Sequence, residues 1–321
     1  MVKDHRRRPA AAGTRGWVII TLAVAAPWTA TACSDLNTPL EYSERLQRRS
    51  IESGGQTRTY LAYVPSTAAP GTPAPLVLVL HGAHQTAEEM QLMSWMNAVG
   101  EDHGAVVVHP QAAGAFWATG GGSPPEYETV DDLGFMDDLV RTVSEGISID
   151  PARVYVTGFS NGGLLAVRLA CQDRERWAAV GLVGALIPAF WDGVCPGGTA
   201  LPAIFIMGDQ DTEFPFPTIS ARSRGLVPAE LTLPYWAGLN GCDGQVEQVE
   251  LADLVDDGTT IEHWTTPKCS GRQETEFYVV HGGGHTWPGS PINLPSSLGR
   301  KSEELDASRT LMSFFLRHSL P

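Results

Sequence analysis

Short apolar runs recur along the chain, separated by segments in which apolar residues are spaced three or four apart. Leu76–Leu80 reads LVLVL, a continuous apolar run that is typical of a strand buried on both faces. Similar runs predict strands at 105–108, 153–157, 178–183 and 203–207, and the alternating stretch 58–65 predicts an earlier one.

Segments with helical spacing fill the intervals between these runs. They predict helices over 87–99, 132–147 and 164–170. Because strands that alternate with helices form βαβ units, we expect an α/β fold with a mostly parallel central sheet flanked by helices on both faces. No internal repeat or Pro/Ser-rich linker interrupts the pattern, which favours a single domain over residues 51–320.

The first 32 residues are predicted to be a signal peptide rather than part of the fold. A basic start is followed by the apolar run Trp17–Ala26 and then by the small residues Ala30-Thr31-Ala32. A membrane-spanning helix is the alternative, but a span needs about 20 apolar residues and Pro27 interrupts this one. Residues 33–50 are predicted to be a linker.

Cleavage is expected directly before Cys33. Ala30-x-Ala32 suits an ordinary signal peptidase, and the same stretch followed by Cys33 resembles a lipoprotein box, although Ala30 stands where Leu is usual. We therefore expect an exported chain that is secreted, periplasmic, or tethered to a membrane by lipid on Cys33.

The chain without its leader is strongly acidic. Loss of residues 1–32 removes five of the 22 basic residues and one of the 36 acidic ones, which leaves a formal charge of −18. Since a nucleic-acid partner needs a basic face, this balance argues against nucleic-acid binding.

Four cysteines follow Cys33, an even number in a chain predicted to be exported, and this favours disulfides. We expect the sequential pairs Cys171–Cys195 and Cys242–Cys269, because each closes a local loop, although three connectivities are open. A zinc site is the alternative, but no pair has the C-x2-C spacing. No metal or organic cofactor is expected.

The segment 154–163 reads VYVTGFSNGG and carries the first sign of chemistry. A β-branched strand leads into Gly158-Phe159-Ser160-Asn161-Gly162, and a helical pattern follows directly. This is the strand–turn–helix context of the G-x-S-x-G nucleophile elbow in α/β-hydrolase folds. An ordinary turn with an incidental serine is the alternative, but we predict that Ser160 is a nucleophile.

A serine hydroxyl needs a general base, and in this fold the order along the chain is Ser, then Asp or Glu, then His. We favour His285, because three flexible glycines precede it and allow its loop to reach over the sheet edge. His281 ends a predicted strand and is the alternative. His263 and His318 are expected at the surface.

The acid of the triad should follow the strand 203–207, where the chain reads Gly208-Asp209-Gln210-Asp211. Asp209 lies close to the glycine and is suited to holding the turn through backbone amides. We therefore predict that Asp211 orients the imidazole, with Asp209 as the alternative.

The developing oxyanion needs two backbone N–H donors. We predict the N–H of Asn161, which follows the nucleophile, and that of Ala83 in the loop Leu80–His84, with His84 as the alternative to Ala83. His81 is expected to brace this loop rather than to react.

Several aromatic residues lie in loops expected at the same edge of the sheet. Trp117 belongs to the Gly- and Pro-rich segment 114–128, while Phe214, Phe216 and Trp287 follow the predicted acid and base. We predict substrate contacts for Trp117, Phe214 and Trp287, with local packing as the alternative for each.

Together these motifs resemble those of a family of secreted esterases that includes polyhydroxybutyrate depolymerases, feruloyl esterases and acetyl xylan esterases. The likeness covers about residues 50–317 and comprises Leu80–Gly82, Val130–Phe135, Arg153–Gly163, Gly282–Gly289 and Asp306–Ser308. One departure is Met207-Gly208, where the family usually has His-Gly. The resemblance implies that Ser160, Asp211 and His285 form the triad and that the substrate is a carboxylic ester.

The leading hypothesis is a serine ester hydrolase that forms an acyl-enzyme on short-chain, feruloyl, acetyl or hydroxyalkanoate esters. A serine peptidase of the same fold is an alternative, although the sequence shows no charged selectivity pocket. A non-catalytic binding protein is the alternative from another class, and the occupied triad positions argue against it.

Overall fold

A computed structural model describes residues 45–189, 195, 197–216, 221 and 225–321, so the predicted leader, Cys33 and most of the predicted linker lie outside the described residues. The first strand, β1 (Leu46–Ser53), begins inside the segment 33–50 predicted as linker. It pairs along its whole length with β2 (Gln56–Tyr63) in antiparallel orientation, so residues 46–50 belong to the sheet.

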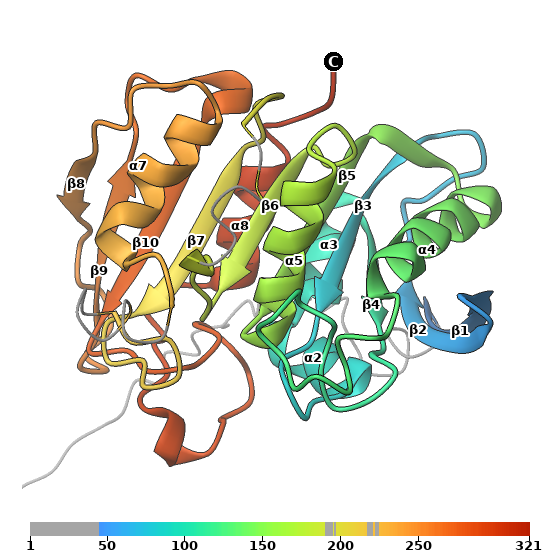
Figure 1. Ribbon diagram of the computed structural model, residues 1–321, viewed down its shortest axis with the longest axis horizontal. Coiled ribbons are helices and arrows are strands. Elements are labelled where there is room, and N and C mark those ends of the chain that lie inside the picture. The colour runs from blue at the N-terminus through green and yellow to red at the C-terminus, as the bar shows by residue number, and fades with distance from the viewer. Residues whose placement is uncertain (1–44, 190–194, 196, 217–220, 222–224) are drawn as a thin grey trace, which may run out of the picture. The chain divides into compact units, whose positions relative to one another are not determined.

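The other strands of the described chain are β3 (Ala74–Leu80), β4 (Val106–Pro110), β5 (Ile149–Phe159), β6 (Ala179–Val183), β7 (Ala203–Gly208), β8 (Glu247–Glu250), β9 (Thr260–Thr265) and β10 (Thr275–His281). Ten strands form one sheet in the order β1-β2-β4-β3-β5-β6-β7-β10-β9-β8 (Figure 1). The six from β4 to β10 are parallel, and the two outer strands on each side are antiparallel. This arrangement confirms the predicted α/β fold class.

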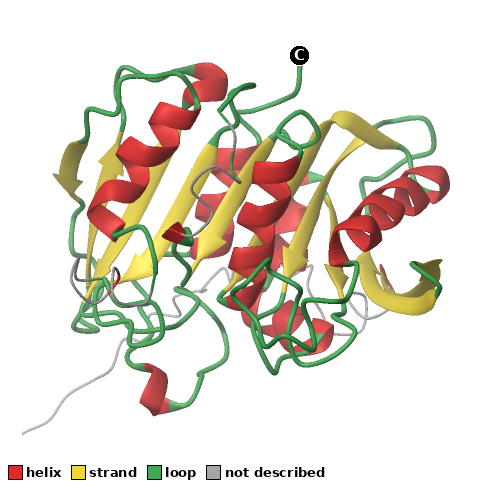
Figure 2. Ribbon diagram, in the orientation of Figure 1, coloured by secondary structure: helices red, strands yellow, loops and turns green. Residues whose placement is uncertain are grey.

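Helices cover both faces of this sheet (Figure 2). One face is covered by α4 (Asp132–Gly146), α5 (Asn161–Gln172) and α7 (Ala229–Leu239), and the other by α2 (Ala87–Ser94), α3 (Met96–His103) and α8 (Ala307–Phe315). Two short 3-10 helices, η2 (Gly271–Gln273) and η3 (Ser296–Leu298), lie in loops. Every residue of β3, β4, β6 and β7 is buried, as their continuous apolar runs require.

The helix predicted over 87–99 is in fact two helices. Trp95 lies between α2 and α3 in the left-handed region, with a φ of 53°, and its N–H donates to the carbonyl oxygen of Gln91. A left-handed residue ends an α-helix because the chain then turns away from the helical path. Apolar spacing could not reveal this break, since Met90 and Met96 on either side of it pack into the same core cluster.

Both predicted disulfides are present. Cys171–Cys195 has a Cα–Cα distance of 4.4 Å and Cys242–Cys269 one of 5.8 Å, with sequence separations of 24 and 27. In the chain-entropy description, a cross-link of this span stabilises the fold by roughly 3 kcal/mol.

No helix within the described residues has the length and apolar character needed to cross a membrane.

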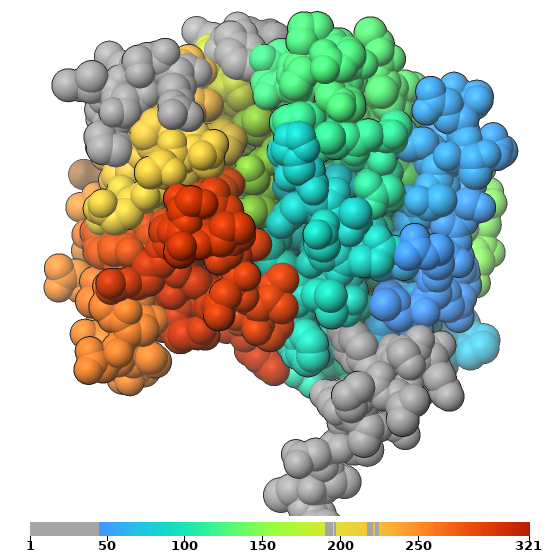
Figure 3. All heavy atoms as spheres, turned by 90° about the horizontal axis from the view of Figure 1, so that it is seen from below, coloured from blue at the N-terminus to red at the C-terminus, as the bar shows by residue number. Residues whose placement is uncertain are grey.

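The carboxyl ends of the parallel strands meet at one edge of the sheet. There β3 ends at Leu80, β5 at Phe159, β7 at Gly208 and β10 at His281, each directly before residues predicted to carry chemistry. Since β3, β5, β6, β7 and β10 are consecutive in the sheet, the loops that follow them converge. Figure 3 views the molecule from this side, where the red-orange segment that follows β10 lies beside the cyan segment that follows β3.

Candidate active site

Ser160 lies at the sharp turn between β5 and α5, where its backbone is strained. Its φ of 54° and ψ of −119° fall in a region that residues other than glycine avoid. The flanking glycines make room for the turn, because a Cβ on Gly158 would collide with the backbone of Gly162, and one on Gly162 with the carbonyl oxygen of Leu80. The geometry predicted for the nucleophile elbow is therefore present.

Asp211 and His285 are in direct contact. Nδ1 of His285 lies 2.7 Å from Oδ2 of Asp211, and both residues are buried. The other oxygen of Asp211 accepts hydrogen bonds from the N–H groups of Glu213 and Phe214, each at 2.8 Å. These bonds hold the carboxylate in place. Because Nδ1 of His285 faces the acid, Nε2 is the ring nitrogen that faces away from it.

Asp209 and His281, the alternatives for acid and base, pair with each other instead. Nδ1 of His281 lies 3.1 Å from Asp209, and Nε2 lies 3.4 Å from Glu262. The N–H of Gly282 donates to the second oxygen of Asp209 at 2.8 Å. With both of its ring nitrogens next to carboxylates, His281 fastens the end of β10 to the turn after β7 and to β9.

The glycines before His285 serve close packing rather than the flexibility expected from the sequence. The N–H of Gly284 donates to the carbonyl oxygen of Arg300 at 2.8 Å, and that of His285 to Leu298 at 2.6 Å. A Cβ on Gly284 would collide with the Leu298 carbonyl. The loop is therefore held by the end of η3 and the residues after it, and only glycine allows the two backbones to approach this closely.

Ser160 and His285 line one pocket of about 420 Å³, with Asp211 behind His285. In the described part of the chain no hydrogen bond joins the Ser160 hydroxyl to the imidazole, and such bonds are often long before substrate binds. The rest of the wall is formed by Gly82, Ala83, His84, Gln85, Glu89, Phe159, Glu213, Leu294, Pro295 and Leu298. Sequence reasoning missed 294–298, because this segment has neither a motif nor a periodic pattern.

The two predicted oxyanion donors lie beside Ser160. Within the described chain the N–H of Ala83 has no hydrogen-bond acceptor, whereas that of His84, the alternative, donates to the carbonyl oxygen of Ala115 at 2.7 Å. The N–H of Asn161 is the first of α5, where a helix offers no internal acceptor. Ala83 and Asn161 therefore fit the role better than His84 does.

His81 braces the loop after β3, as its sequence position suggested. Nδ1 donates to the carbonyl oxygen of Gly82 at 2.8 Å, and Nε2 accepts from the N–H of Ala112 at 3.1 Å. Burial lowers the pKa of His81 to about 4, so the ring is neutral near pH 7. A neutral ring has the one donor and one acceptor that these contacts need.

Two of the predicted substrate contacts are wrong. Trp117 is 0% exposed and Trp287 is 1% exposed, so neither ring can lie against a substrate. The indole N–H of Trp117 donates to the carbonyl oxygen of His81 at 2.8 Å, and that of Trp287 to the Ser308 hydroxyl at 3.1 Å. An indole turns inward when its N–H finds an acceptor there, and the loop sequence does not reveal this.

The other aromatic residues differ in their relation to the pocket. Phe214 is half-buried, and its ring stacks on His285 with 5.9 Å between ring centroids, so it remains a candidate for substrate contact. Phe216 packs edge-on against Trp264, at 6.0 Å. The prediction that His318 lies at the surface is wrong, because its side chain is 3% exposed.

Comparison with known proteins relates this chain to esterases. Residues 51–289 match the family model described as "Putative esterase". The chain is 28% identical over 289 residues to "Putative esterase NocK" of Nocardia uniformis subsp. tsuyamanensis, covering 84% of this chain and 82% of that protein. It is 23% identical over 245 residues to feruloyl esterase B of Piromyces equi, covering 71% of this chain and 42% of that protein.

Among solved structures, the acetyl xylan esterase from Aspergillus awamori superposes with a TM-score of 0.56 at 18% sequence identity. The match covers 84% of this chain and 99% of that one. At this identity the likeness concerns the fold.

Proposed function

This chain belongs to the esterase family and is a carboxylic ester hydrolase, and we propose that it works through an acyl-enzyme formed on Ser160. The observation that carries the proposal is the 2.7 Å contact between Asp211 and His285, in a pocket that Ser160 also lines. Strain at Ser160 supports it, since residues held in unfavourable backbone conformations gather at functional sites.

In the proposed reaction, the Ser160 Oγ attacks the ester carbonyl carbon while Nε2 of His285 takes the hydroxyl proton. Asp211 holds the imidazole in the required tautomer and stabilises the imidazolium that forms. The N–H groups of Ala83 and Asn161 donate to the oxyanion of the tetrahedral intermediate. The alcohol then leaves with the proton from His285, and water, activated by the same imidazole, hydrolyses the acyl-enzyme.

The substrate proposed for this site is a small carboxylic ester. A pocket of about 420 Å³ lies within the range of about 300–1,000 Å³ that small-molecule sites occupy. Phe159, Leu294 and Leu298 supply apolar wall for an acyl chain or a ring. Short-chain, acetyl, feruloyl and hydroxyalkanoate esters are the candidates, and the names of the relatives support the acetyl and feruloyl groups.

We also propose that the chain works outside the cytoplasm. Its two disulfides form and persist in oxidising compartments, and the predicted leader provides a route for export. Lipidation of Cys33 would tether the chain to a membrane. Mass spectrometry of the purified mature N-terminus tests cleavage of the leader and lipidation of Cys33. An unmodified N-terminal residue at position 33 or beyond would show that the leader is removed and would exclude the lipid.

Comparison of wild type with Ser160→Ala tests the mechanism. The substrates are p-nitrophenyl acetate and butyrate, methyl ferulate and hydroxybutyrate oligomers. We expect the variant to lose a factor of at least about 10⁴ in kcat, since the remaining triad has no nucleophile. Ser144→Ala, on α4 away from the pocket, should keep wild-type activity. A fully active Ser160→Ala variant would remove Ser160 as the nucleophile.

A further inference from the structure

Trp117 forms hydrogen bonds to both of the segments that carry the proposed oxyanion donors. Its indole N–H donates to the carbonyl oxygen of His81, two residues before Ala83, at 2.8 Å. Its backbone N–H donates to Oδ1 of Asn161 at 2.7 Å. Because Trp117 is fully buried, both bonds are shielded from water and resist exchange with solvent.

Ser123 closes the same network. Its hydroxyl donates to the carbonyl oxygen of Trp117 at 2.6 Å and accepts from Nδ2 of Asn161 at 2.9 Å. The side-chain amide of Asn161 is therefore hydrogen-bonded through both its oxygen and its nitrogen to one loop, while its backbone N–H is the proposed oxyanion donor. Displacement of this loop must shift Asn161 as well.

The loop is itself fixed to the rest of the fold next to Trp117. The N–H of Ala118 donates to the buried Asp132 carboxylate at 2.7 Å. The carbonyl oxygen of Ala118 accepts a hydrogen bond from Arg168 at 2.6 Å. Asp132 also forms a buried ion pair with Arg58 of β2 at 2.6 Å. Trp117 is thus held by β2, α4 and α5, and can transmit their rigidity to the two donor segments.

We propose that Trp117 is a positioning residue that sets the spacing of the two oxyanion donors. The proposal rests on the proposed function, because the donors matter only if an oxyanion forms at Ser160. Such donors act when they lie about 2.7–3.1 Å from the oxyanion, so a shift of the Ala83 segment relative to Asn161 weakens both bonds. The oxyanion is absent from the bound substrate, so the loss falls on kcat rather than on KM.

Trp117→Phe tests this role because it keeps a buried ring and removes the indole donor. We expect kcat for p-nitrophenyl butyrate to fall by about 10- to 100-fold, with KM within about twofold of wild type. The affinity for a trifluoromethyl ketone should fall by a similar factor, because its tetrahedral adduct with Ser160 places an oxyanion between the same donors. A merely structural role would leave this affinity unchanged in the folded enzyme.

Trp236→Phe is the matched control. Trp236 is also 0% exposed, and its indole N–H donates to the carbonyl oxygen of Leu201 at 2.8 Å. It lies in α7, whereas the pocket wall is built from other segments. Both variants lose the same kind of bond and should lose similar thermal stability, but only Trp117→Phe should lose kcat. Equal kcat in the two variants would overturn the proposal.

Ser123→Ala decides the question if Trp117→Phe does not fold. Ser123 is half-buried in the loop, so its loss should leave Tm nearly unchanged while kcat falls by about 3- to 10-fold. Ser144→Ala, which removes a hydrogen bond to the Val140 carbonyl oxygen at 2.7 Å, should change neither Tm nor kcat. Wild-type kcat in Ser123→Ala would then overturn the proposal.

The wild-type enzyme and Ser160→Ala separate this inference from the proposed function. An active wild type, an inactive Ser160→Ala and a fully active Trp117→Phe would overturn the role of Trp117 alone. A wild type inert on every ester, or an active Ser160→Ala, would overturn the proposed function and the role of Trp117 with it.

Discussion

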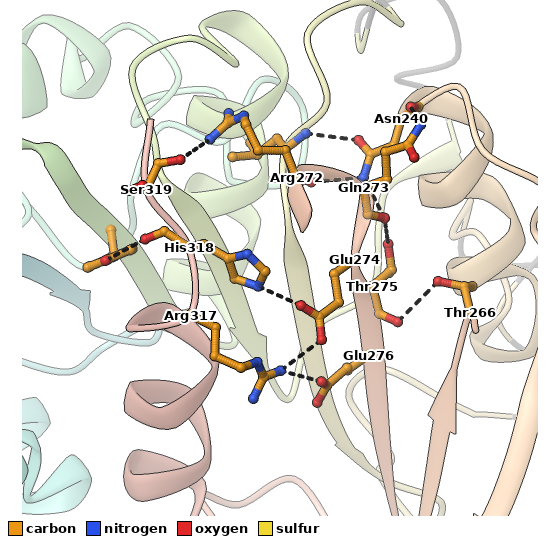
Figure 4. Close-up of polar contacts among 12 residues, drawn as sticks. Asn240, Thr266, Arg272, Gln273, Glu274, Thr275, Glu276, Arg317, His318 and Ser319 are labelled. Carbon is orange, nitrogen blue, oxygen red and sulfur yellow. Dashed lines mark hydrogen bonds and ion pairs between the residues drawn. The ribbon is translucent and has the colours of Figure 1, made fainter. Parts of the chain in front are cut away.

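His285 and His318 are both buried and both paired with a carboxylate, yet they differ in what surrounds the pair. His285 lies 2.7 Å from Asp211 at the carboxyl edge of the sheet. His318 lies 3.0 Å from Glu274 near the end of the chain (Figure 4). An imidazole next to a carboxylate therefore does not by itself identify the proposed catalytic site.

The surroundings explain the difference between the two pairs. Around His318, the Glu274 carboxylate also faces Arg317 at 3.1 Å, and Arg317 contacts Glu276 (Figure 4). The Tyr155 hydroxyl donates to the His318 carbonyl oxygen. This cluster fastens the end of the chain to β5 and β10. At the carboxyl edge, His285 lines a pocket together with a strained serine. Access to a pocket and to a serine therefore distinguishes the pair that we propose to be catalytic.

The largest expected difference between the pairs is in catalysis. Asp211→Asn should lower kcat by about 10⁴-fold, because the amide can hold the wrong tautomer of His285. Glu274→Gln should leave kcat at the wild-type value. Steady-state kinetics of both variants on p-nitrophenyl butyrate would check this. A similar kcat in the two variants would show that the two pairs do not differ in catalysis.

The next largest effect concerns stability. Phe314 is fully buried, and its ring packs on His318 with 4.7 Å between centroids. Phe314→Ala should lower the free energy of unfolding by about 3–5 kcal/mol, because it leaves a cavity in the core beneath α8. The folded fraction should keep its kcat. Urea unfolding at pH 7, together with activity per folded molecule, would test both statements.

The C-terminal pair should also contribute a pH-dependent stability. The contact with His318, and then the charge of Arg317, lower the pKa of Glu274 to about 2 from an ordinary value of 4.5. The folded state thus favours the carboxylate, so its contribution is complete above pH 4.5 and is lost as the pH falls from 4.5 towards 2.

Wild type should therefore exceed Glu274→Gln in free energy of unfolding by roughly 2 kcal/mol near pH 6, and by less at pH 3. Urea denaturation of both proteins at the two pH values measures this difference. A constant difference would show that Glu274 does not titrate between them.

The smallest expected effect belongs to the ring that stacks on His285. Phe214 is half-buried, so Phe214→Ala should change the free energy of unfolding by less than about 1 kcal/mol. We expect kcat/KM to fall by about 10-fold, because the ring stacks on the imidazole of His285. Phe314→Ala should show the opposite pattern, with a large loss of stability and an unchanged kcat of the folded fraction. Loss of stability without loss of kcat/KM would place Phe214 with the packing residues.

Much of the candidate site could be proposed from the sequence because its constraints are local. Gly158 and Gly162 are needed by the turn itself, and the order of Ser160, Asp211 and His285 follows from the strands that precede them. The pairing of the four cysteines followed from short sequence separations in the same way.

The predictions that failed depended on contacts between distant parts of the chain. The burial of Trp117 is set by an acceptor 36 residues away, and that of His318 by Glu274, 44 residues away. The bend at Trp95 is a backbone property that leaves the apolar spacing intact. For the same reason, the wall residues at 294–298 could be found only once the fold had brought them to the pocket.

Covalent labelling of Ser160 is the most direct test of the acyl-enzyme mechanism. The folded enzyme is treated with diethyl p-nitrophenyl phosphate, and the modified residue is located by peptide mass spectrometry. We predict one diethylphosphoryl group on Ser160, in proportion to the activity lost, and little labelling in His285→Gln, which lacks the general base. Full inactivation with the label on another residue, or full activity with Ser160 labelled, would contradict the mechanism.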